Sequence, residues 1–398
     1  MALDPEDARN IPAHLIALYT DAELALLRLL AEAIADGIDA DDWQQVQASR
    51  QAEFRQAAEA LARHLQAAMP PLLQDAVQAA TDLGEQAADE DADTPEPPEA
   101  VSVAATGTAA TVAGSAPRRD RPRNPRTVAA TQSAWSTLAR TTQLLPANAD
   151  RLYGQVLAQI QVRSPDVPRT TPHTGGILGA PRATGTRLDA AQQALDILTK
   201  RGITGFKDGR GRNWSLTSYV EMLSRTVVNE ELREAHIARA LEHGHTLMVV
   251  SSHSKPAPQC QPFEGQVLSL DGSTGTIELE SATTGRPVRV TIKATMREAI
   301  SKGFRHPNCG HALSRFVPGA SRTFTTKPDP EGYAATQKQR DMERAIRDTR
   351  VKQAVAITPQ AKREANARLR AQQAAIRQHV DEHGLTRRPR REQINRAR

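Results

Sequence analysis

The chain has 398 residues, which is enough for two or three domains of ordinary size. Only 3% of these residues are aromatic and 39% are hydrophobic, so the side chains that best fill a protein core are scarce. This composition argues against a compact enzyme that fills the whole length. We expect one modest core, long helices and sizeable stretches without a core of their own.

Charge is distributed unevenly along the chain, although the net charge is only +5. Residues 1–100 contain 21 acidic residues and 5 arginines, a net charge of −16, whereas residues 337–398 contain 17 basic and 7 acidic residues, a net charge of +10. This asymmetry predicts separate partners for the two ends. The basic end fits phosphate contacts with nucleic acid, docking to another protein, or a helix face that is merely solvated.

The cysteines and the hydropathy constrain the location of the protein. Cys260 and Cys309 are the only cysteines, and two cysteines do not make a disulfide framework. We find no signal peptide and therefore expect a reducing cytosol as the compartment. No run of 18 or more apolar residues occurs, so we expect no membrane contact.

The N-terminal region has helical periodicity. Thr20 and Glu23 stand just before a run of apolar residues, which fits a capping box and predicts a helix that starts at Thr20. Two more helices are predicted over 42–69 and 72–83, on either side of the Pro70-Pro71 pair. The next stretch is acidic and Pro-rich, then rich in Ala, Thr, Gly and Ser, and finally basic. Because it cannot bury enough apolar surface to fold, we predict a disordered linker.

The middle of the chain has a different pattern. A hairpin with Asp208-Gly209 as its turn is predicted between Phe206 and Trp214. Ser215 is a suitable N-cap for a long helix that ends near Gly244. The other elements predicted here are helices over 128–145, 147–162, 189–201 and 296–301, and strands of a small antiparallel sheet over 247–251, 267–270, 276–280 and 288–293.

These elements predict an α+β fold: a mainly helical chain with one small antiparallel-sheet domain and long helical arms. The tail is basic, helical and nearly free of large apolar side chains, with breaks at Thr358-Pro359 and Gly384, so we expect it to need a partner or to fray. The expected segments are an acidic helical region over 1–85, the linker over 86–128, a helical connector and loop over 129–186, an α+β domain over 187–318 and the basic helical tail over 319–398.

One dense group of residues could carry chemistry. Thiolate and imidazole are ligands that tetrahedral zinc prefers, and the candidate ligands are Cys260, His306, Cys309 and His311. Their spacing matches no standard zinc finger. Two other interpretations stay open: a hydrogen-bonded polar core with two buried thiols, and a catalytic Cys–His pair. The chain has no nucleotide-binding loop, nucleophile elbow or zinc-protease motif, and we predict that it is not an enzyme.

Several short motifs, taken together, resemble one known family, the phage minor capsid proteins of type 2. The Asn308-Cys309 step is also similar to a box of the Mu F-like head-morphogenesis proteins. Gly310 departs from the pattern, because the family usually has an arginine there. The residues that carry the resemblance are Trp214, Tyr219, Arg225, Thr226, Ser252, His253, Gln261, Gly265, Asn308, Cys309, His311, Arg340, Arg344 and Arg347.

The resemblance implies a Mu F-like α+β domain over 187–318 and a structural role in the head of a phage or prophage. It implies portal, major capsid or scaffold proteins as partners during head assembly and DNA packaging or delivery, and packaged DNA as a further partner of the basic tail. The expected location is the head of the virion, after assembly in the host cytoplasm. Apart from a structural zinc, we expect no cofactor and no small-molecule substrate. The alternatives are a Cys/His hydrolase or nuclease and a DNA-binding accessory protein.

Overall fold

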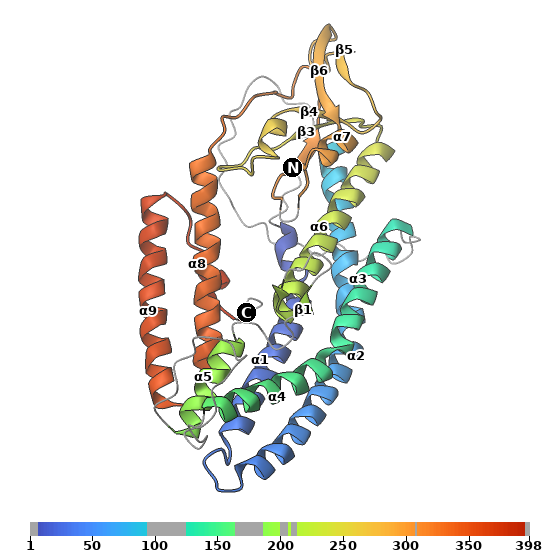
Figure 1. The fold of residues 1–398 in the computed structure, drawn as a ribbon. Coiled ribbons are helices and arrows are strands. Elements are labelled where there is room, and N and C mark those ends of the chain that lie inside the picture. The colour runs from blue at the N-terminus through green and yellow to red at the C-terminus, as the bar shows by residue number, and fades with distance from the viewer. Residues whose placement is uncertain are drawn as a thin grey trace. The chain divides into compact units, whose positions relative to one another are not determined.

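The structure is a computed structural model that describes residues 7–93, 125–163, 186–199, 206–207, 213–306 and 309–394. Its fold is α+β, as predicted: mainly helical, with one small five-stranded sheet (Figure 1). The described residues form two compact units, each assembled from three separate segments. They are the sheet unit, with residues within Met1–Ile11, Asp75–Ser133 and Thr226–Pro330, and the helical unit, with residues within Pro12–Gln74, Ala134–Arg225 and Glu331–Arg398.

The helical unit contains a core of long helices. Two of its largest fully buried side chains are tyrosines: the Tyr19 hydroxyl bonds to Thr142 at 2.8 Å, and the Tyr153 hydroxyl donates to Gln47 at 2.7 Å. No helix in the described part of the chain is both long and apolar enough to cross a lipid bilayer. The helices that lie wholly or partly in this unit are α1 (Ala13–Ala35), α2 (Trp43–Asp93), α3 (Pro125–Gln143), α4 (Leu145–Arg163), α5 (Arg187–Thr199), α6 (Leu216–Glu242), α8 (Pro330–Ala354) and α9 (Pro359–Glu382).

The predicted capping box at Thr20 is wrong. Thr20 lies inside α1, which begins seven residues earlier at Ala13, and its hydroxyl donates to the carbonyl oxygen of Ile16 at 2.7 Å. Glu23 instead accepts hydrogen bonds from the backbone N–H, at 3.0 Å, and the hydroxyl of Thr217, in the first turn of α6. Its carboxylate therefore caps a different helix, distant in sequence, and burial raises the pKa of this carboxyl.

Helix α2 runs through the two prolines that were expected to end it. Pro70 and Pro71 both lie inside the helix, each without a backbone N–H to donate. Leu65, Met69 and Leu73 are buried at four-residue spacing on both sides of the pair, so tertiary packing keeps the chain helical there. The helix continues to Asp93 and α3 begins at Pro125, so both ends of the expected linker over 86–128 are helical. Residues 94–124 lie outside the described residues, and so does most of the expected loop over 163–186.

The five-stranded sheet belongs to the sheet unit, and its strand order is β5-β6-β4-β3-β7. It was expected to be antiparallel, but it is mixed, because β4 and β6 are parallel. The chain reverses direction twice between these two strands, which restores the original direction. Strand β7 was not predicted. The strands are β3 (Leu247–Val250), β4 (Val267–Ser269), β5 (Gly275–Glu280), β6 (Pro287–Thr295) and β7 (Leu313–Arg315), and the short helix α7 (Met296–Ser301) follows β6 as predicted.

The structure confirms the hairpin, the N-cap and the helix end that were predicted around α6. Strands β1 (Phe206–Lys207) and β2 (Asn213–Trp214) pair as an antiparallel hairpin, whose predicted turn at Asp208-Gly209 lies outside the described residues. The hydroxyl of Ser215 accepts from the backbone N–H of Ser218 at 3.2 Å, as an N-cap does. Gly244 follows the helix with a φ of 81°, the conformation that favours glycine after a helix end.

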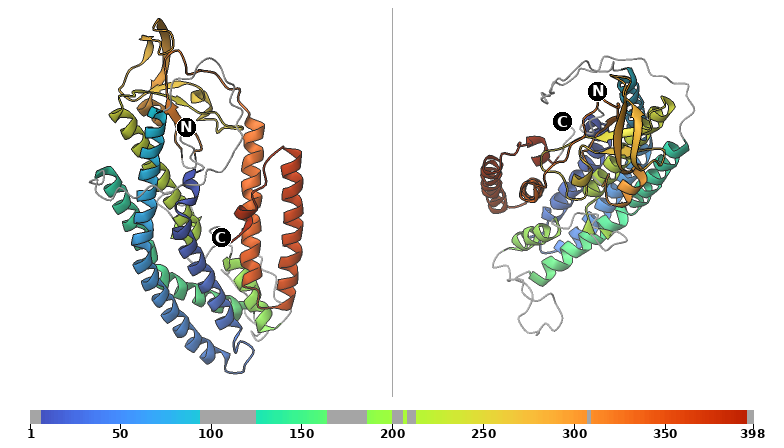
Figure 2. Two further views of the ribbon diagram at one scale, coloured as in Figure 1. Left: turned by 180° about the vertical axis from the view of Figure 1, so that it is seen from behind. Right: turned by 90° about the horizontal axis from the view of Figure 1, so that it is seen from above.

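The basic tail forms a helical hairpin with a small core of its own. Helices α8 and α9 run side by side (Figures 1 and 2), and Ile346, Ile376 and Val380 are buried between them. The predicted break at Thr358 is confirmed, since its hydroxyl caps α9. The expectation that the tail needs a partner or frays is wrong for the described residues, because apolar residues at helical spacing give the two helices a common face.

Candidate functional site

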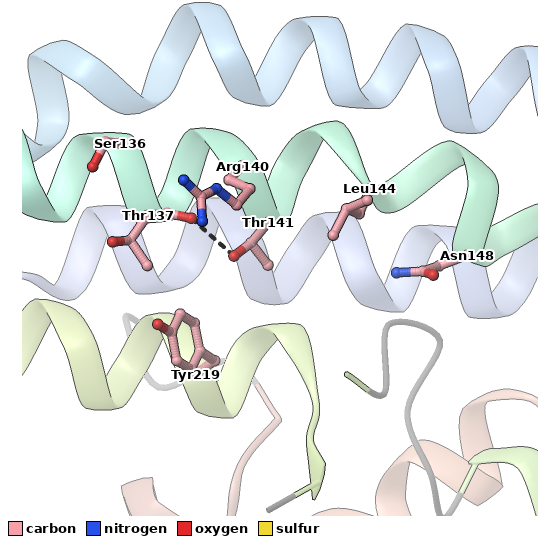
Figure 3. A pocket seen from close by; sticks show the side chains of 7 residues that line it. All are labelled: Ser136, Thr137, Arg140, Thr141, Leu144, Asn148 and Tyr219. Atoms are coloured by element: carbon pink, nitrogen blue, oxygen red, sulfur yellow. Dashed lines mark hydrogen bonds between the residues drawn. The ribbon is translucent and has the colours of Figure 1, made fainter. Parts of the chain in front are cut away.

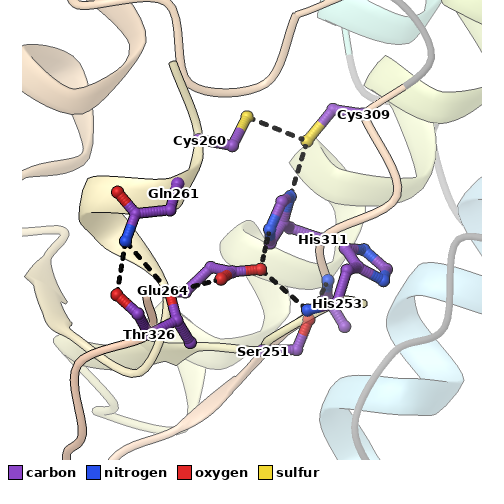
Figure 4. A network of polar contacts seen from close by, with 9 residues as sticks. Ser251, His253, Cys260, Gln261, Glu264, Cys309, His311 and Thr326 are labelled. Carbon is purple, nitrogen blue, oxygen red and sulfur yellow. Dashed lines mark hydrogen bonds and ion pairs between the residues drawn. The ribbon is translucent and has the colours of Figure 1, made fainter. Parts of the chain in front are cut away.

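The candidate site lies in the sheet unit, where two connecting segments meet next to β3 (Figure 4). The first connects β3 to β4 and contains the short helix η2 (Gln261–Phe263), and the second joins α7 to β7. The side chains that they bring together form what we call the Cys/His centre: His253, Cys260 and Glu264 from the first segment, and His306, Cys309 and His311 from the second.

The two cysteines of the centre are in direct contact. The Sγ atoms of Cys260 and Cys309 lie 3.7 Å apart, both thiols are free, and the residues are 0% and 4% exposed. The hydrogen bond with Cys260, together with smaller effects of His311 and Arg233, lowers the pKa of Cys309 to about 3, against the effect of burial. The same contact, together with burial, raises the pKa of Cys260. This contact therefore favours a thiolate on Cys309 over one on Cys260.

A buried carboxylate organises the other side of the centre. His311 lies between Cys309 and Glu264, with Nδ1 3.3 Å from the thiolate sulfur and Nε2 2.9 Å from the carboxylate. Burial opposes protonation of His311, but the contacts with Cys309 and Glu264 raise its pKa. Glu264 also accepts from the backbone N–H of His253 at 2.7 Å and from the hydroxyl of Thr326 at 2.6 Å. One carboxylate thus ties together the segment between β3 and β4, the segment between α7 and β7, and the segment that carries Thr326.

Two arginines bind the segment between α7 and β7 to α6. Arg233 donates from Nη2 to the carbonyl oxygen of Cys309 at 2.6 Å. Arg305 donates to Glu230 and Glu234 of α6, at 3.0 Å each. Both arginine side chains are 4% exposed, although Glu230 and Glu234 face the solvent in part, and the Arg233 bond holds the backbone of Cys309 in place.

Two kinds of chemistry match this arrangement. The ligand atoms of Cys260, His306 and Cys309 all lie within 4.8 Å of one another, which suits a metal ion. Cys309, His311 and Glu264 also form a row of nucleophile, base and orienting group. However, Cys309 and His311 are each only 4% exposed, so the thiolate is closed to a substrate in this conformation. Burial therefore favours a structural role for the centre.

The predicted motif residues Gln261 and Gly265 hold the segment that follows β7. The side-chain amide of Gln261 donates to the carbonyl oxygen of Thr326 at 2.5 Å. Gly265 has a φ of 67°, and a Cβ atom at this position would lie 2.5 Å from the ring of Phe324, so glycine is required there for two reasons. Ser252 is exposed, and the neighbouring His253 ring meets His311 edge-on, with ring centroids 4.4 Å apart.

Other predicted motif residues lie in the helical unit. Tyr219 lines a pocket of about 350 Å³ between α3, α4 and α6 (Figure 3). Arg225 pairs with Glu221 on the same helix at 2.9 Å. Arg344 pairs with Asp341, and Arg347 donates to the carbonyl oxygen of Arg391.

The remaining four predicted motif residues lie on α6, on α8, in β2 and before Cys309. Thr226 is the first α6 residue of the sheet unit, and Arg340 is a half-buried residue of α8. The backbone of Trp214 lies in β2, but its side chain is outside the described residues, as is the whole of Asn308.

Sequence reasoning missed three residues on which the centre depends: Arg233, Glu264 and Thr326. Glu264 stands between Gln261 and Gly265, which were both singled out, so its position inside that motif was the available signal. Arg233 lies on α6 among glutamates, so the sequence suggested an ordinary ion pair on the helix surface. Thr326 belongs to an extended segment with no pattern that distinguishes it.

The buried centre and the long, charged helices fit a structural protein. A family model for phage minor capsid protein 2 matches residues 181–381, just over half of the chain. The chain belongs to this family of phage minor capsid proteins, which makes it a structural phage protein. The match spans both the Cys/His centre and the α8–α9 hairpin. No curated protein and no solved structure matches the chain.

Proposed function

We propose that the protein is a low-copy component of the phage head that joins portal, major capsid or scaffold proteins during assembly, and that its α8–α9 hairpin reaches the packaged DNA. The observation that carries this proposal is the surface of α9. Its buried side packs into the hairpin core, while Arg363, Arg370 and Arg377 are exposed at seven-residue spacing, on one face of the helix. Such a row suits the repeated phosphates of a nucleic acid backbone.

The acidic front of the chain supports a second contact, with protein. Helix α2 contains nine acidic residues and only three arginines among its 51 residues, and many of its charged side chains are exposed. A surface of this charge repels DNA and suits a basic patch on another head protein. The two charged regions therefore have different partners, as an adaptor inside the head requires.

Location in the particle tests the main proposal. Heads purified from a phage or an induced prophage that encodes this chain should contain it in a few copies, measured by quantitative mass spectrometry against the major capsid protein. Cross-linking in the same heads should join it to the portal or to an inner capsid surface. Heads that mature and package DNA without containing the chain would overturn the proposal.

The role of the α9 arginines is tested by the salt dependence of DNA binding. In the variant R363Q/R370Q/R377Q, the slope of log K against log salt should become shallower by about 2 to 3, since each lost phosphate contact removes about 0.9. The matched control R363K/R370K/R377K keeps the charge and should keep the slope. An unchanged slope in the glutamine variant would show that α9 does not contact DNA and would favour docking to protein.

A further inference from the structure

We propose that the sheet unit binds one zinc ion through Cys260, His306 and Cys309, with His311 as the fourth ligand, and that this ion fastens the η2 segment to the segment between α7 and β7. Such an ion would be a structural part of the fold, in addition to the contacts with head proteins and DNA proposed above. The site is defined by residues from two connecting segments, one after β3 and one before β7.

The distances between the donor atoms fit a tetrahedral ion. Two thiolates bound to one zinc at about 2.3 Å, with a tetrahedral angle between them, lie about 3.8 Å apart. The Sγ atoms of Cys260 and Cys309 lie 3.7 Å apart, and a ring nitrogen of His306 completes a group whose atoms are all within 4.8 Å of one another. A disulfide has a sulfur–sulfur distance of about 2.05 Å, so the present separation does not describe an oxidised pair.

The proposed fourth ligand, His311, lies next to this three-residue group. Its Nδ1 lies 3.3 Å from the sulfur of Cys309, while its Nε2 is bonded to the buried carboxylate of Glu264 at 2.9 Å. Histidines that bind zinc usually donate their other ring N–H to a carboxylate or a carbonyl group, which fixes the ring and raises its basicity. Glu264 is in the position for this supporting contact, and its side chain is fully buried.

The chemistry of the donors selects the ion. Two sulfur and two nitrogen donors suit zinc and disfavour calcium or magnesium, which require oxygen. A set of four protein ligands leaves no open position, so the ion would be structural and not catalytic. Binding would also give each buried thiol a strong partner within the core of the sheet unit.

The experiment uses the untagged, full-length chain incubated with one equivalent of zinc and then dialysed. Elemental analysis should find about one zinc per chain, and cobalt in place of zinc should give the visible absorption of a tetrahedral thiolate complex. The variants C260S and C309S should lose the ion. Because H306N changes a half-exposed side chain, it tests the site without opening the core, and it should bind zinc at least ten times more weakly.

The matched control is H243N, which removes an α6-flanking histidine of the same unit that is not among the four ligands. It should keep the full zinc content. If the wild-type chain retains no zinc and gives no cobalt spectrum while its circular dichroism shows the folded protein, the proposal is wrong. Equal zinc affinity in H306N and H243N would also overturn this ligand set.

Discussion

Replacing Glu264 with alanine should destabilise the sheet unit by about 3–5 kcal/mol, because removing one partner of a buried charged network leaves the others without compensation. The carboxylate accepts hydrogen bonds from His311, His253 and Thr326, and the residue is only 1% exposed. In E264A, the imidazole of His311 would remain buried beside the Cys309 thiolate with no acceptor for its second nitrogen. The segment that carries Thr326 would lose an anchor as well.

Unfolding of the two units can be followed separately, because each unit has its own probe. All three tryptophans lie in segments of the helical unit, whereas both cysteines lie in the sheet unit. The rate at which Cys260 and Cys309 react with a thiol reagent in increasing urea therefore reports opening of the sheet unit. It should rise steeply in E264A, while tryptophan fluorescence should change little.

A suitable control for E264A is E278A, since Glu278 is an exposed glutamate of β5 in the same unit. This variant should stay within about 0.5 kcal/mol of the wild type, as surface substitutions usually do. E264Q keeps the shape and one acceptor and should fall between the two. If E264A and E278A opened at the same urea concentration, the carboxylate would not be what joins the segments of the Cys/His centre.

Local signals predicted much of the fold correctly. The strands near 267–270, 276–280 and 288–293 were found because β-branched residues alternate between turn residues, and the helix after Ser215 was found because its cap and its end signal are both local. These are features that a few neighbouring residues decide. Each of these elements is present in the structure, and its observed boundaries differ from the predicted ones by only a few residues.

The errors share one physical cause, which is packing between residues far apart in the chain. The Pro70-Pro71 pair is a strong local stop, but burial of Met69 and Leu73 outweighs it. Thr20 and Glu23 match a local cap, yet Glu23 caps α6 because that helix begins against it. The parallel pairing of β4 and β6 likewise depends on which strands meet, and hydrophobic alternation does not contain that information.

For the candidate site, the residue types with distinctive chemistry were predictable and their supporting residues were not. Cys260, Cys309 and His311 do lie together, as expected of residues that share a site. Arg233 and Thr326 act through a backbone carbonyl and a hydroxyl, contacts that any arginine or threonine of the chain could make. Only the three-dimensional structure distinguishes Arg233 and Thr326 from the other arginines and threonines of the chain.

Two helical glycines should respond to the same substitution with opposite signs. Gly84 lies where α2 crosses α6 within the sheet unit, and a Cβ atom there would overlap the carbonyl oxygen of Leu232 and lie 3.0 Å from the Cβ atom of Ala235. The alanines at 76, 80 and 87 continue the same close contact. Gly154 lies inside α4 of the helical unit, and a Cβ atom there would meet nothing within 4 Å.

Alanine at either position gains about 1 kcal/mol of helix propensity, so the difference between the two variants isolates the contact with α6. G154A should be more stable than the wild type by about 0.5–1 kcal/mol, seen as a later tryptophan transition in urea. G84A must push the backbones of α2 and α6 apart, at a cost of about 1–3 kcal/mol or more, because a carbonyl oxygen cannot rotate away as a side chain would. Its cysteines should therefore react at lower urea than those of the wild type. If G84A instead protected them, the two helices would not approach each other at Gly84, and the small residues of α2 would have no packing role.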